Sequence, residues 1–440
     1  MKNISSDSIR KMLTPFNIFA AMVLLGFAGY LFYAYRYGST VTDFFVMENV
    51  DLKFCDFRMH VEFVGDPKNL YSRATFGAGC FPPLSYLMYY FASRILTRNG
   101  AVPGLTLDFN TAPYAFLVIV YYTLAVSFLL FLGISLWGDD RKRAALLFIC
   151  LMVSVPFFAG GVSVANSTLM VMALMLIALK LKDSESRFLR ELALIIIAVC
   201  AGFKIYPAVF GLYYLLEKRF KEAIRLTIYG IVLFFSPFAL FGGLDGFTRW
   251  LFNVRSTMSF NDYGRFQCIR GLIVTITTYL HIDHLVPHII VSITPYLFVV
   301  LMIVLASLTK NRYRRLFFLC AIMSFFPTNA YRYTLCYLSL PFIVYFMDKT
   351  GKDKEGAGEA RKGPGVTEYI ETVLFSLVYA LPCIFGKIMK FEPTFEVYTM
   401  TYVEIRVYIA AYLLLGFIMI HEICVLIRSR NNRQSSSNVS

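Results

Sequence analysis

The stretch GSTVTDFFVMENVDLKFCDFRMHVEFVGDPKNLYSRATFGAGC, residues 38–80, decides how the chain is interpreted, because nearly everything around it is apolar. It runs directly into FPPLSYLMYY, residues 81–90. We interpret the stretch as a loop that carries a catalytic carboxylate, held at a membrane surface by apolar helices. Its acids are Asp43, Glu48, Asp51, Asp56, Glu62 and Asp66.

The composition is that of a membrane protein with many spans. Of the 440 residues, 58% are hydrophobic and only 16% are charged, whereas about a quarter of a soluble domain is charged. The mean hydropathy of +0.62 agrees. The net charge of +14 comes from basic runs between apolar segments, which is typical of cytoplasmic loops rather than of a nucleic-acid-binding surface. We therefore predict an all-α polytopic fold.

Lysines and arginines assign a side to each loop and predict about 12 spans with both termini in the cytoplasm. The first apolar run, residues 15–35, reads as an anchor helix, since no small-residue cleavage site follows it. Residues 81–96 are short for a span, and as a span they would place GDDRKR (138–143) outside. We interpret 81–96 as a juxtamembrane or re-entrant helix on the outer face.

The whole chain, 1–440, is expected to form a single integral membrane domain. We found no convincing internal repeat, which weighs against a transporter. The linker is charged and rich in glycine, so disorder is expected there. The predicted parts are a catalytic core at 15–347 with outer loops at 37–111 and 241–285, a cytoplasmic linker at 348–365, C-terminal helices at 366–427, and a cytoplasmic tail at 428–440.

The nine cysteines show neither a CxxC pair nor another metal-binding spacing. Cys55, Cys80 and Cys268 fall in predicted outer loops, so a disulfide among them stays open. The run HIDHLVPH (281–288) places three histidines at spacings that can share a helical face. Nothing nearby completes a site, and a hydrated junction between loop and helix is the commoner cause, so no metal site is predicted.

Charged residues at membrane depth are costly and are functional candidates by default. Lys204, in AGFKIYP, lies where two short apolar halves meet beside a glycine and a proline. It is either a snorkelling side chain or an ammonium that binds a lipid phosphate. Arg332, in TNAYRYTL, allows the same two interpretations at another outer turn. Arg265 and Arg270, in NDYGRFQCIRG, are weaker phosphate-binding candidates.

Two further patterns bear on chemistry. Asp56 and His60 are four residues apart, within one helical turn, and can act as a general base and the group that orients it. The chain lacks a dinucleotide fingerprint, a Walker loop, HExxH and GxSxG. An activated substrate is therefore expected to arrive through the membrane.

Several motifs, taken in order, resemble the GT-C superfamily of glycosyltransferases. The first-loop signature comprises Asp56–Phe57, GDPKNLY (65–71) and FPPLSYL (81–87). The resemblance is closest to glycosyltransferase family 87, whose members use polyprenyl-phosphate sugars and include mannosyltransferases. It continues through VSVANSTLMVMALMLIAL (162–179), AGFKIYPAVFGLYYL (201–215) and PTNAYRYTLCYLSLP (327–341).

The chain also departs from that family's pattern at two points. Ser163-Val164-Ala165-Asn166 stands where Gly-Gln-Asn is usual, and Arg332 stands where a histidine is common. Both departures leave the identity of donor and acceptor open. The resemblance implies a GT-C-like bundle with juxtamembrane helices in its first outer loop.

The resemblance also implies an inverting reaction at the extracytoplasmic face of the plasma membrane. Asp56 would be the general base, with Asp51 as the competing candidate. Mannose, or a similar hexose or pentose, would pass from a polyprenyl phosphate to a lipid-linked or cell-envelope glycan; no nucleic acid is involved, and a divalent cation such as Mg²⁺ or Mn²⁺ stays open. Lys204, Arg332, Arg270 and Arg265 would bind the donor phosphate, with His60, Tyr71, Asn166, Tyr206 and Tyr331 in supporting roles.

Two other functions fit the same features. A flippase or transporter of lipid-linked glycans would use the same outer cations, but it needs a polar route across the bilayer, and few charges lie deep in the apolar segments. A membrane glycan polymerase would also combine many spans with large outer loops. A flipping assay separates the first alternative from a transferase, and the length of the product separates the second.

Overall fold

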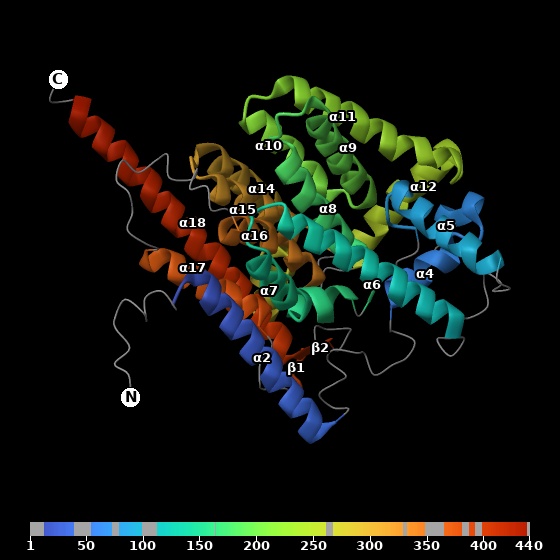
Figure 1. Ribbon diagram of the computed structural model, residues 1–440, viewed down its shortest axis with the longest axis horizontal. Helices are drawn as coiled ribbons and strands as arrows, with labels where there is room; N and C mark the ends of the chain where they lie inside the picture. The colour runs from blue at the N-terminus through green and yellow to red at the C-terminus, as the bar shows by residue number, and fades with distance from the viewer. Residues whose placement is uncertain are drawn as a thin grey trace.

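The protein is described by a computed structural model that is helical almost throughout (Figure 1). One antiparallel pair of strands, β1 (Lys387–Phe391) and β2 (Tyr398–Thr401), departs from the all-α prediction, with Phe391 opposite Tyr398. The described residues are 13–38, 54–72, 79–98, 112–162, 164–260, 267–328, 332–347, 365–380, 387–391 and 398–437.

Four helices of the described ranges are long and apolar enough to cross a membrane. The prediction of about 12 spans is not confirmed by this count. The four are α2 (Pro15–Tyr37), α11 (Phe220–Phe235) with the 3-10 turn η5 (Ser236–Ala239), α14 (His288–Leu308), and residues 405–429 of α18 (Tyr402–Ser437).

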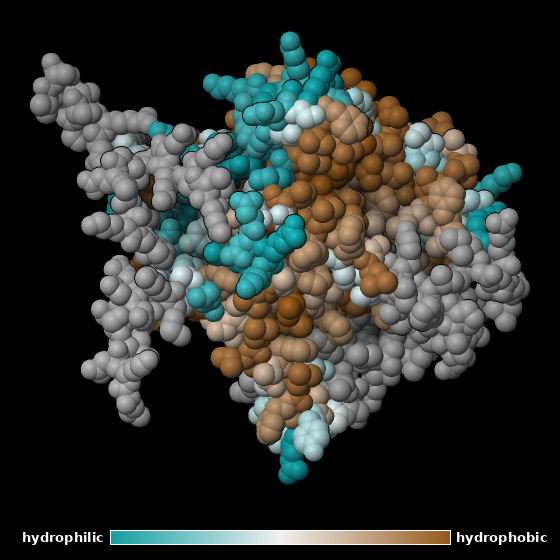
Figure 2. Space-filling model, viewed as in Figure 1, coloured by the Kyte–Doolittle hydropathy of each residue, from teal (hydrophilic) through white to brown (hydrophobic). Residues whose placement is uncertain are grey.

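The outward faces of these helices are apolar, as expected of surfaces in contact with lipid. On α11, Ile224, Ile228, Ile231 and Val232 are each at least half exposed. Figure 2 shows apolar residues across much of one face of the molecule, below a hydrophilic cap at its top. Because a water-soluble protein rarely exposes so much contiguous apolar surface, the chain is a membrane protein.

Three apolar segments of the chain are divided into shorter helical pieces, and the breaks matter because site residues lie in or beside them. Pro207 falls in the first turn of η4, where its missing N–H costs nothing. The pieces are α7 (Arg141–Met152) with the π-helix η3 (Val155–Val162), α9 (Arg187–Phe203) with η4 (Tyr206–Val209) and α10 (Phe210–Leu216), and α15 (Arg312–Phe325) with η7 (Arg332–Leu338) and α16 (Ser339–Met347).

Two groups of helices flank a buried central helix, α8 (Thr168–Leu181). On one flank, α17 (Val366–Tyr379) packs between α2 and α18, and the ring of Phe375 stacks on Phe342 at 3.7 Å between centroids. On the other flank, α9 and α11 lie side by side (Figure 1). Helix α6 (Ala112–Ser135) packs against α8.

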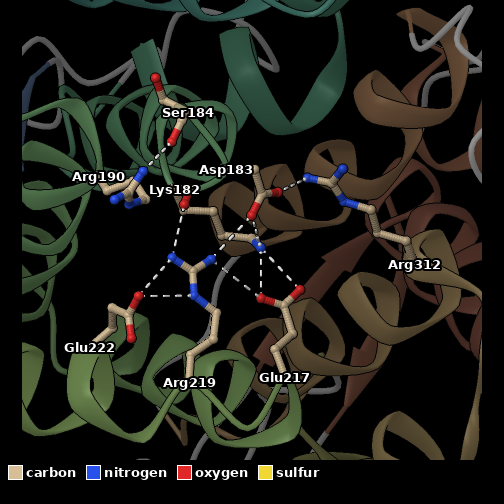
Figure 3. A network of polar contacts seen from close by, with 8 residues as sticks. All are labelled: Lys182, Asp183, Ser184, Arg190, Glu217, Arg219, Glu222 and Arg312. Atoms are coloured by element: carbon tan, nitrogen blue, oxygen red, sulfur yellow. Dashed lines mark hydrogen bonds and ion pairs between the residues drawn. The ribbon is translucent and has the colours of Figure 1, made fainter. Parts of the chain in front are cut away.

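Residues from three segments that are expected in the cytoplasm meet in a network of ion pairs (Figure 3). Lys182, which is 1% exposed, pairs with Asp183 at 2.8 Å and with Glu217 at 2.9 Å. Asp183 also pairs with Arg219 and Arg312. Because Lys182 precedes α9 and Glu217 follows α10, this ion pair shows that the chain reverses direction between α9 and α10. The reversal expected around Lys204 is therefore present.

Candidate active site

The acidic first loop contributes two helical pieces, α4 (Cys55–Phe63) and η2 (Pro67–Ser72), which lead to α5 (Pro83–Arg98). Helix α5 packs against α4 and α9. Gly202, near the end of α9, permits this approach, because a Cβ there would lie 2.7 Å from the Leu84 side chain of α5. The first loop is thereby brought to the end of α9.

Asp56 opens α4 and is held by a turn more than one hundred residues away in sequence. Its backbone N–H donates to the carbonyl of Val164 at 3.2 Å. The Asn166 side-chain Nδ2 donates to the Asp56 Oδ2 at 2.5 Å. Asn166 is 1% exposed, and its Oδ1 accepts from the backbone N–H of Thr168 at 3.0 Å. These two contacts fix the amide so that its N–H group faces the carboxylate.

The turn that carries Asn166 has an uncommon backbone. Ala165 has φ +52°, in the left-handed region that residues with a Cβ seldom adopt. Such a conformation persists only where the surroundings stabilise it, and it often occurs at functional sites. Here it lets one turn bind the same residue twice: the carbonyl of Val164 accepts from the Asp56 backbone N–H, and the amide of Asn166 donates to the Asp56 carboxylate.

Lys204 follows the last residue of α9 and is 4% exposed. Its ammonium nitrogen lies 3.5 Å from the centroid of the Phe81 ring, a cation–π contact. Asp56 and Cys80 are both close enough to interact electrostatically with the ammonium. An unpaired ammonium is costly to bury, so the Asp56 carboxylate compensates a charge that the apolar surroundings would otherwise disfavour.

His60 lies behind this pair, in a cluster of aromatic rings. It is 2% exposed, its ring centroid lies 4.0 Å from that of Phe81 and 5.0 Å from that of Tyr89, and its Nδ1 has no hydrogen-bond partner. The oriented hydrogen bond to Asp56 comes from Asn166, not from His60. Burial, and secondarily the charge of Lys204, hold the pKa of His60 well below its usual value. The imidazole is therefore neutral at pH 7.

This burial predicts an acid-sensitive fold. Between its lowered folded-state pKa and the usual value near 6.5, His60 binds a proton only when the chain unfolds, so stability falls as the pH drops below about 6.5. The slope is about 1.4 kcal/mol per pH unit for one such group. We expect His60→Phe to lose less thermal stability than wild type between pH 7 and pH 5 in detergent. Parallel curves for the two proteins would contradict this.

Helix α12 (Gly243–Phe260) holds the short segment that leads into α5. Asn253 Nδ2 donates to the backbone carbonyls of Tyr71 at 3.0 Å and Gly79 at 3.4 Å. Trp250 Nε1 donates to the carbonyl of Cys80 at 3.3 Å. The Tyr71 hydroxyl donates to the carbonyl of Phe81 at 3.3 Å. Together these bonds set the position of the ring that covers Lys204.

We predict that Asn253→Asp lowers sugar transfer about tenfold, by turning a donor that faces two carbonyls into an acceptor. The Asn253 amide is closely packed against the backbone of Gly79 (φ +64°), because a Cβ on that glycine would lie 2.9 Å from Asn253 Nδ2. Steady-state rates and melting temperatures in detergent measure the effect. Asn253→His, which retains an N–H donor, should recover part of the loss. Wild-type activity in Asn253→Asp would show that α12 does not position the site.

Cys80 borders the site but is not suited to act as a nucleophile. Burial raises the pKa of its thiol, and the opposing effect of Lys204 is smaller. The group is therefore a protonated thiol at neutral pH, and the thiolate is the reactive form. The disulfide that the sequence leaves open among three cysteines does not join Cys80 to Cys268; the side chain of the third, Cys55, is outside the described set.

Of the remaining predicted site residues, some lie on elements near Asn166 and the others lie outside the described residues. Arg332 begins η7, which packs against η3 and α8, the elements on either side of Asn166. Arg270 lies in α13 (Ile269–Tyr279), and Gln267, just before that helix, donates to Thr334 of η7. Both arginines are half-buried on neighbouring elements, and Tyr206 is half-buried in η4. Asp51, Arg265 and Tyr331 lie outside the described residues.

The histidine-rich run ends up at a helix junction. The described part of the chain shows no group of three His, Cys, Asp or Glu side chains placed to hold a metal ion. His284 lies in the 3-10 turn η6 (Asp283–Leu285), and His288 begins α14. His288 Nδ1 lies 3.3 Å from the Ser292 hydroxyl, one helical turn further on.

The structure thus defines a helical membrane protein whose candidate site combines three groups: a half-buried acid, an amide that orients it, and a lysine covered by an aromatic ring. Residues 82–328 match the model of glycosyltransferase family 87. This match covers more than half of the chain, so the protein belongs to glycosyltransferase family 87 and is a membrane glycosyltransferase. No curated protein and no solved structure matches the chain. The match includes Asn166 and Lys204, whereas Asp56 precedes it.

Sequence reasoning missed the residues that support the site. In the sequence, Phe81 stands out only as the first residue of the FPPLSYL motif, and the residues of α12 fall in the expected outer loop 241–285. A signal was present, because Arg249, Trp250 and Asn253 lie at helical spacing on one face. Arg249 also donates to the Ser72 hydroxyl at 2.8 Å. A polar and aromatic face of this kind, in an expected outer loop, predicts a helix that packs on other loop elements.

Proposed function

We propose that this glycosyltransferase moves a sugar from a polyprenyl phosphate to a glycan or glycolipid hydroxyl, with inversion, at the extracytoplasmic face of the membrane. The observation that carries the proposal is the convergence of Asp56, Asn166 and Lys204 from three distant segments. An acid held beside a cation is what a transfer from a lipid phosphate requires: one group takes a proton, and another faces developing negative charge.

In the proposed step, the Asp56 carboxylate removes the proton of the acceptor hydroxyl as that oxygen bonds to the anomeric carbon. The bond between that carbon and the phosphate oxygen breaks on the opposite face, and its electron pair leaves with the lipid phosphate. Asn166 holds the carboxylate in position. The charge of Lys204 acts on the departing phosphate, and Arg332 and Arg270 are the further cations assigned to it.

The side of the membrane follows from the charge distribution. The clusters around Lys182, Arg219 and Arg312 lie before α9, after α10 and at the start of α15. Lys204 lies at the far end of α9, about 25 Å away for a 17-residue helix. Because basic loops favour the cytoplasm, Asp56 and Lys204 are assigned to the outer face.

The test is incubation of purified protein in detergent with a panel of polyprenyl-phosphate sugars, mannose first, and a lipid-linked glycan acceptor. We expect one donor to yield a single-sugar product with inverted anomeric configuration, resolved by mass spectrometry and NMR. Lipid-linked glycan crossing proteoliposomes without any transfer would favour a flippase. Long products would favour a polymerase.

A further inference from the structure

Four elements of the fold meet at one buried glutamine, Gln267, which is 1% exposed and lies just before the residue that caps α13. Its side-chain Nε2 donates to the carbonyl of Ser324 in α15 at 3.3 Å and to the hydroxyl of Thr334 in η7. Its backbone carbonyl accepts from the hydroxyl of Tyr412 in α18 at 2.7 Å. Gln267 thus joins the start of α13 to three elements that are distant in sequence.

The η7 side of this junction is fixed by bonds of its own. The Ser324 hydroxyl donates to the carbonyl of Thr334 at 3.1 Å, and the Thr334 hydroxyl donates to the carbonyl of Ser324 at 3.4 Å. Both side chains are buried. The hydroxyl of Tyr379 in α17 also donates to the carbonyl of Leu335 at 2.8 Å. The start of α13 is therefore bonded to a part of η7 that is itself held in place.

The side-chain amide of Gln267 is oriented, but its hydrogen bonds are incomplete. Its Nε2 faces the Ser324 carbonyl, which can only accept, so the amide cannot be turned the other way. Among the described residues, its Oε1 has no hydrogen-bond partner, although it is buried. A buried acceptor without a partner costs free energy, and an apolar side chain of similar size would avoid that cost. Stability alone therefore does not account for the amide, whereas alignment of α13 with η7 does.

Two arginines lie close to this junction along the chain. Arg270 is in the first turn of α13, one turn after Gln267, and Arg332 begins η7, two residues before Thr334. We propose that Gln267 is a positioning residue that sets the separation of these two arginines, so that both guanidinium groups bind the phosphate of the donor; the inference rests on the proposed function. Guanidinium groups bind phosphate through directed hydrogen bonds, so their relative placement decides how many of these bonds form.

The experiment measures how much the phosphate group contributes to binding. Polyprenyl phosphate and the corresponding polyprenol, which lacks the phosphate, are compared as inhibitors of sugar transfer, and the ratio of their inhibition constants is the readout. We expect Gln267→Met, which removes the amide at similar volume, to lower the preference for the phosphate about tenfold, the effect of losing one hydrogen bond to a charged group. The KM for the acceptor should not change. A residue that only supported the fold would alter the binding of both inhibitors alike.

A double-mutant cycle tests whether Gln267 acts through η7. Thr334→Val removes the hydroxyl that accepts from Gln267 and keeps a similar shape, so we expect a similar loss of preference for the phosphate. Because the two residues share one contact, the double variant should be little worse than either single variant. Thr372→Val in α17 is the matched control, since Thr372 is also buried and donates to a backbone carbonyl, that of Glu368 at 2.8 Å, but takes no part in the junction. Its preference should equal that of wild type.

Four results would overturn the inference: an unchanged preference in folded Gln267→Met, losses that add fully in the double variant, the same loss in Thr372→Val, or an unchanged preference when Arg270 and Arg332 are both replaced by glutamine. Melting temperatures are measured for each variant, and if Gln267→Met does not fold, Thr334→Val decides the question. Absence of transfer by wild type from any polyprenyl-phosphate sugar would instead refute the proposed function.

Discussion

Asp56→Asn is expected to abolish measurable sugar transfer while the protein remains folded. A general base contributes about 10²–10⁴-fold to such a step, and an amide cannot take the proton. The substitution is nearly isosteric, and the introduced amide keeps an oxygen that accepts from Asn166 Nδ2, as the Asp56 carboxylate does. The measurement is the initial rate at saturating donor and acceptor, with the melting temperature recorded for the same preparation.

Asp66→Asn is the matched control, since it is the same exchange in the same loop. Asp66 is exposed and caps its own turn, accepting from the Asn69 side chain at 2.9 Å. We expect its transfer rate to stay within about twofold of wild type, as for most surface changes. Full activity in Asp56→Asn would remove Asp56 from the role of base, and Asp51 would be tested next.

The sequence predicts those parts of the site where a single residue is unfavourable in its local context, such as a charge in an apolar run or a proline in a helical one. Lys204 stands out in an apolar run, and Pro207 three residues later indicates a break. Charge clusters also indicated correctly that the chain returns along α10, and the ion pair of Lys182 with Glu217 bears this out. In each case the physical signal is local, because burial of a charge or loss of a backbone donor is costly wherever the chain goes.

What was not predictable depends on contacts between distant segments. Asn253 and Tyr71 are 182 residues apart, and no local pattern pairs them. The cover of Phe81 over Lys204 likewise exists only once α5 packs on α9. The expected span at 144–160 is broken at Met152 and continues as a π-helix, a form that hydrophobic periodicity does not distinguish from an α-helix. The break inside 144–160 was therefore not visible in the sequence.

The second large effect concerns two buried lysines that lie in very different surroundings. Lys182 is 1% exposed and Lys204 is 4% exposed. Lys182 has two carboxylate partners within 3 Å, those of Asp183 and Glu217. Lys204 has Asp56 within electrostatic reach and an aromatic ring over its ammonium. The first arrangement is a closed ion-pair network, and the second leaves a charge beside the proposed reacting atoms.

Replacing each lysine by methionine, which is similar in volume and uncharged, should distinguish the role of Lys204 from that of Lys182. Lys204→Met is expected to lower kcat/KM for the donor about 10²–10³-fold, the usual loss when one charge-stabilising group is removed. Its stability should change little, because Asp56 is only half-buried and keeps its hydrogen bond from Asn166, so its carboxylate is not left as an isolated buried charge. Lys182→Met should instead keep its transfer rate and lose about 2 kcal/mol of stability, less than a fully buried pair loses since Glu217 is 23% exposed.

The informative result is that Lys204→Met loses transfer but not stability while Lys182→Met loses stability but not transfer. A lysine that only supports the fold cannot reduce transfer without also reducing stability. Rates with the active donor and unfolding in detergent, recorded on the same two variants, provide both readouts. Lys204→Arg adds a third, since it keeps the charge and can stack on the Phe81 ring but brings a larger, planar head group into a buried position; intermediate activity is expected. If Lys204→Met transfers sugar as wild type does, the ammonium serves only to balance the Asp56 carboxylate, and the departing phosphate depends on the arginines of α13 and η7.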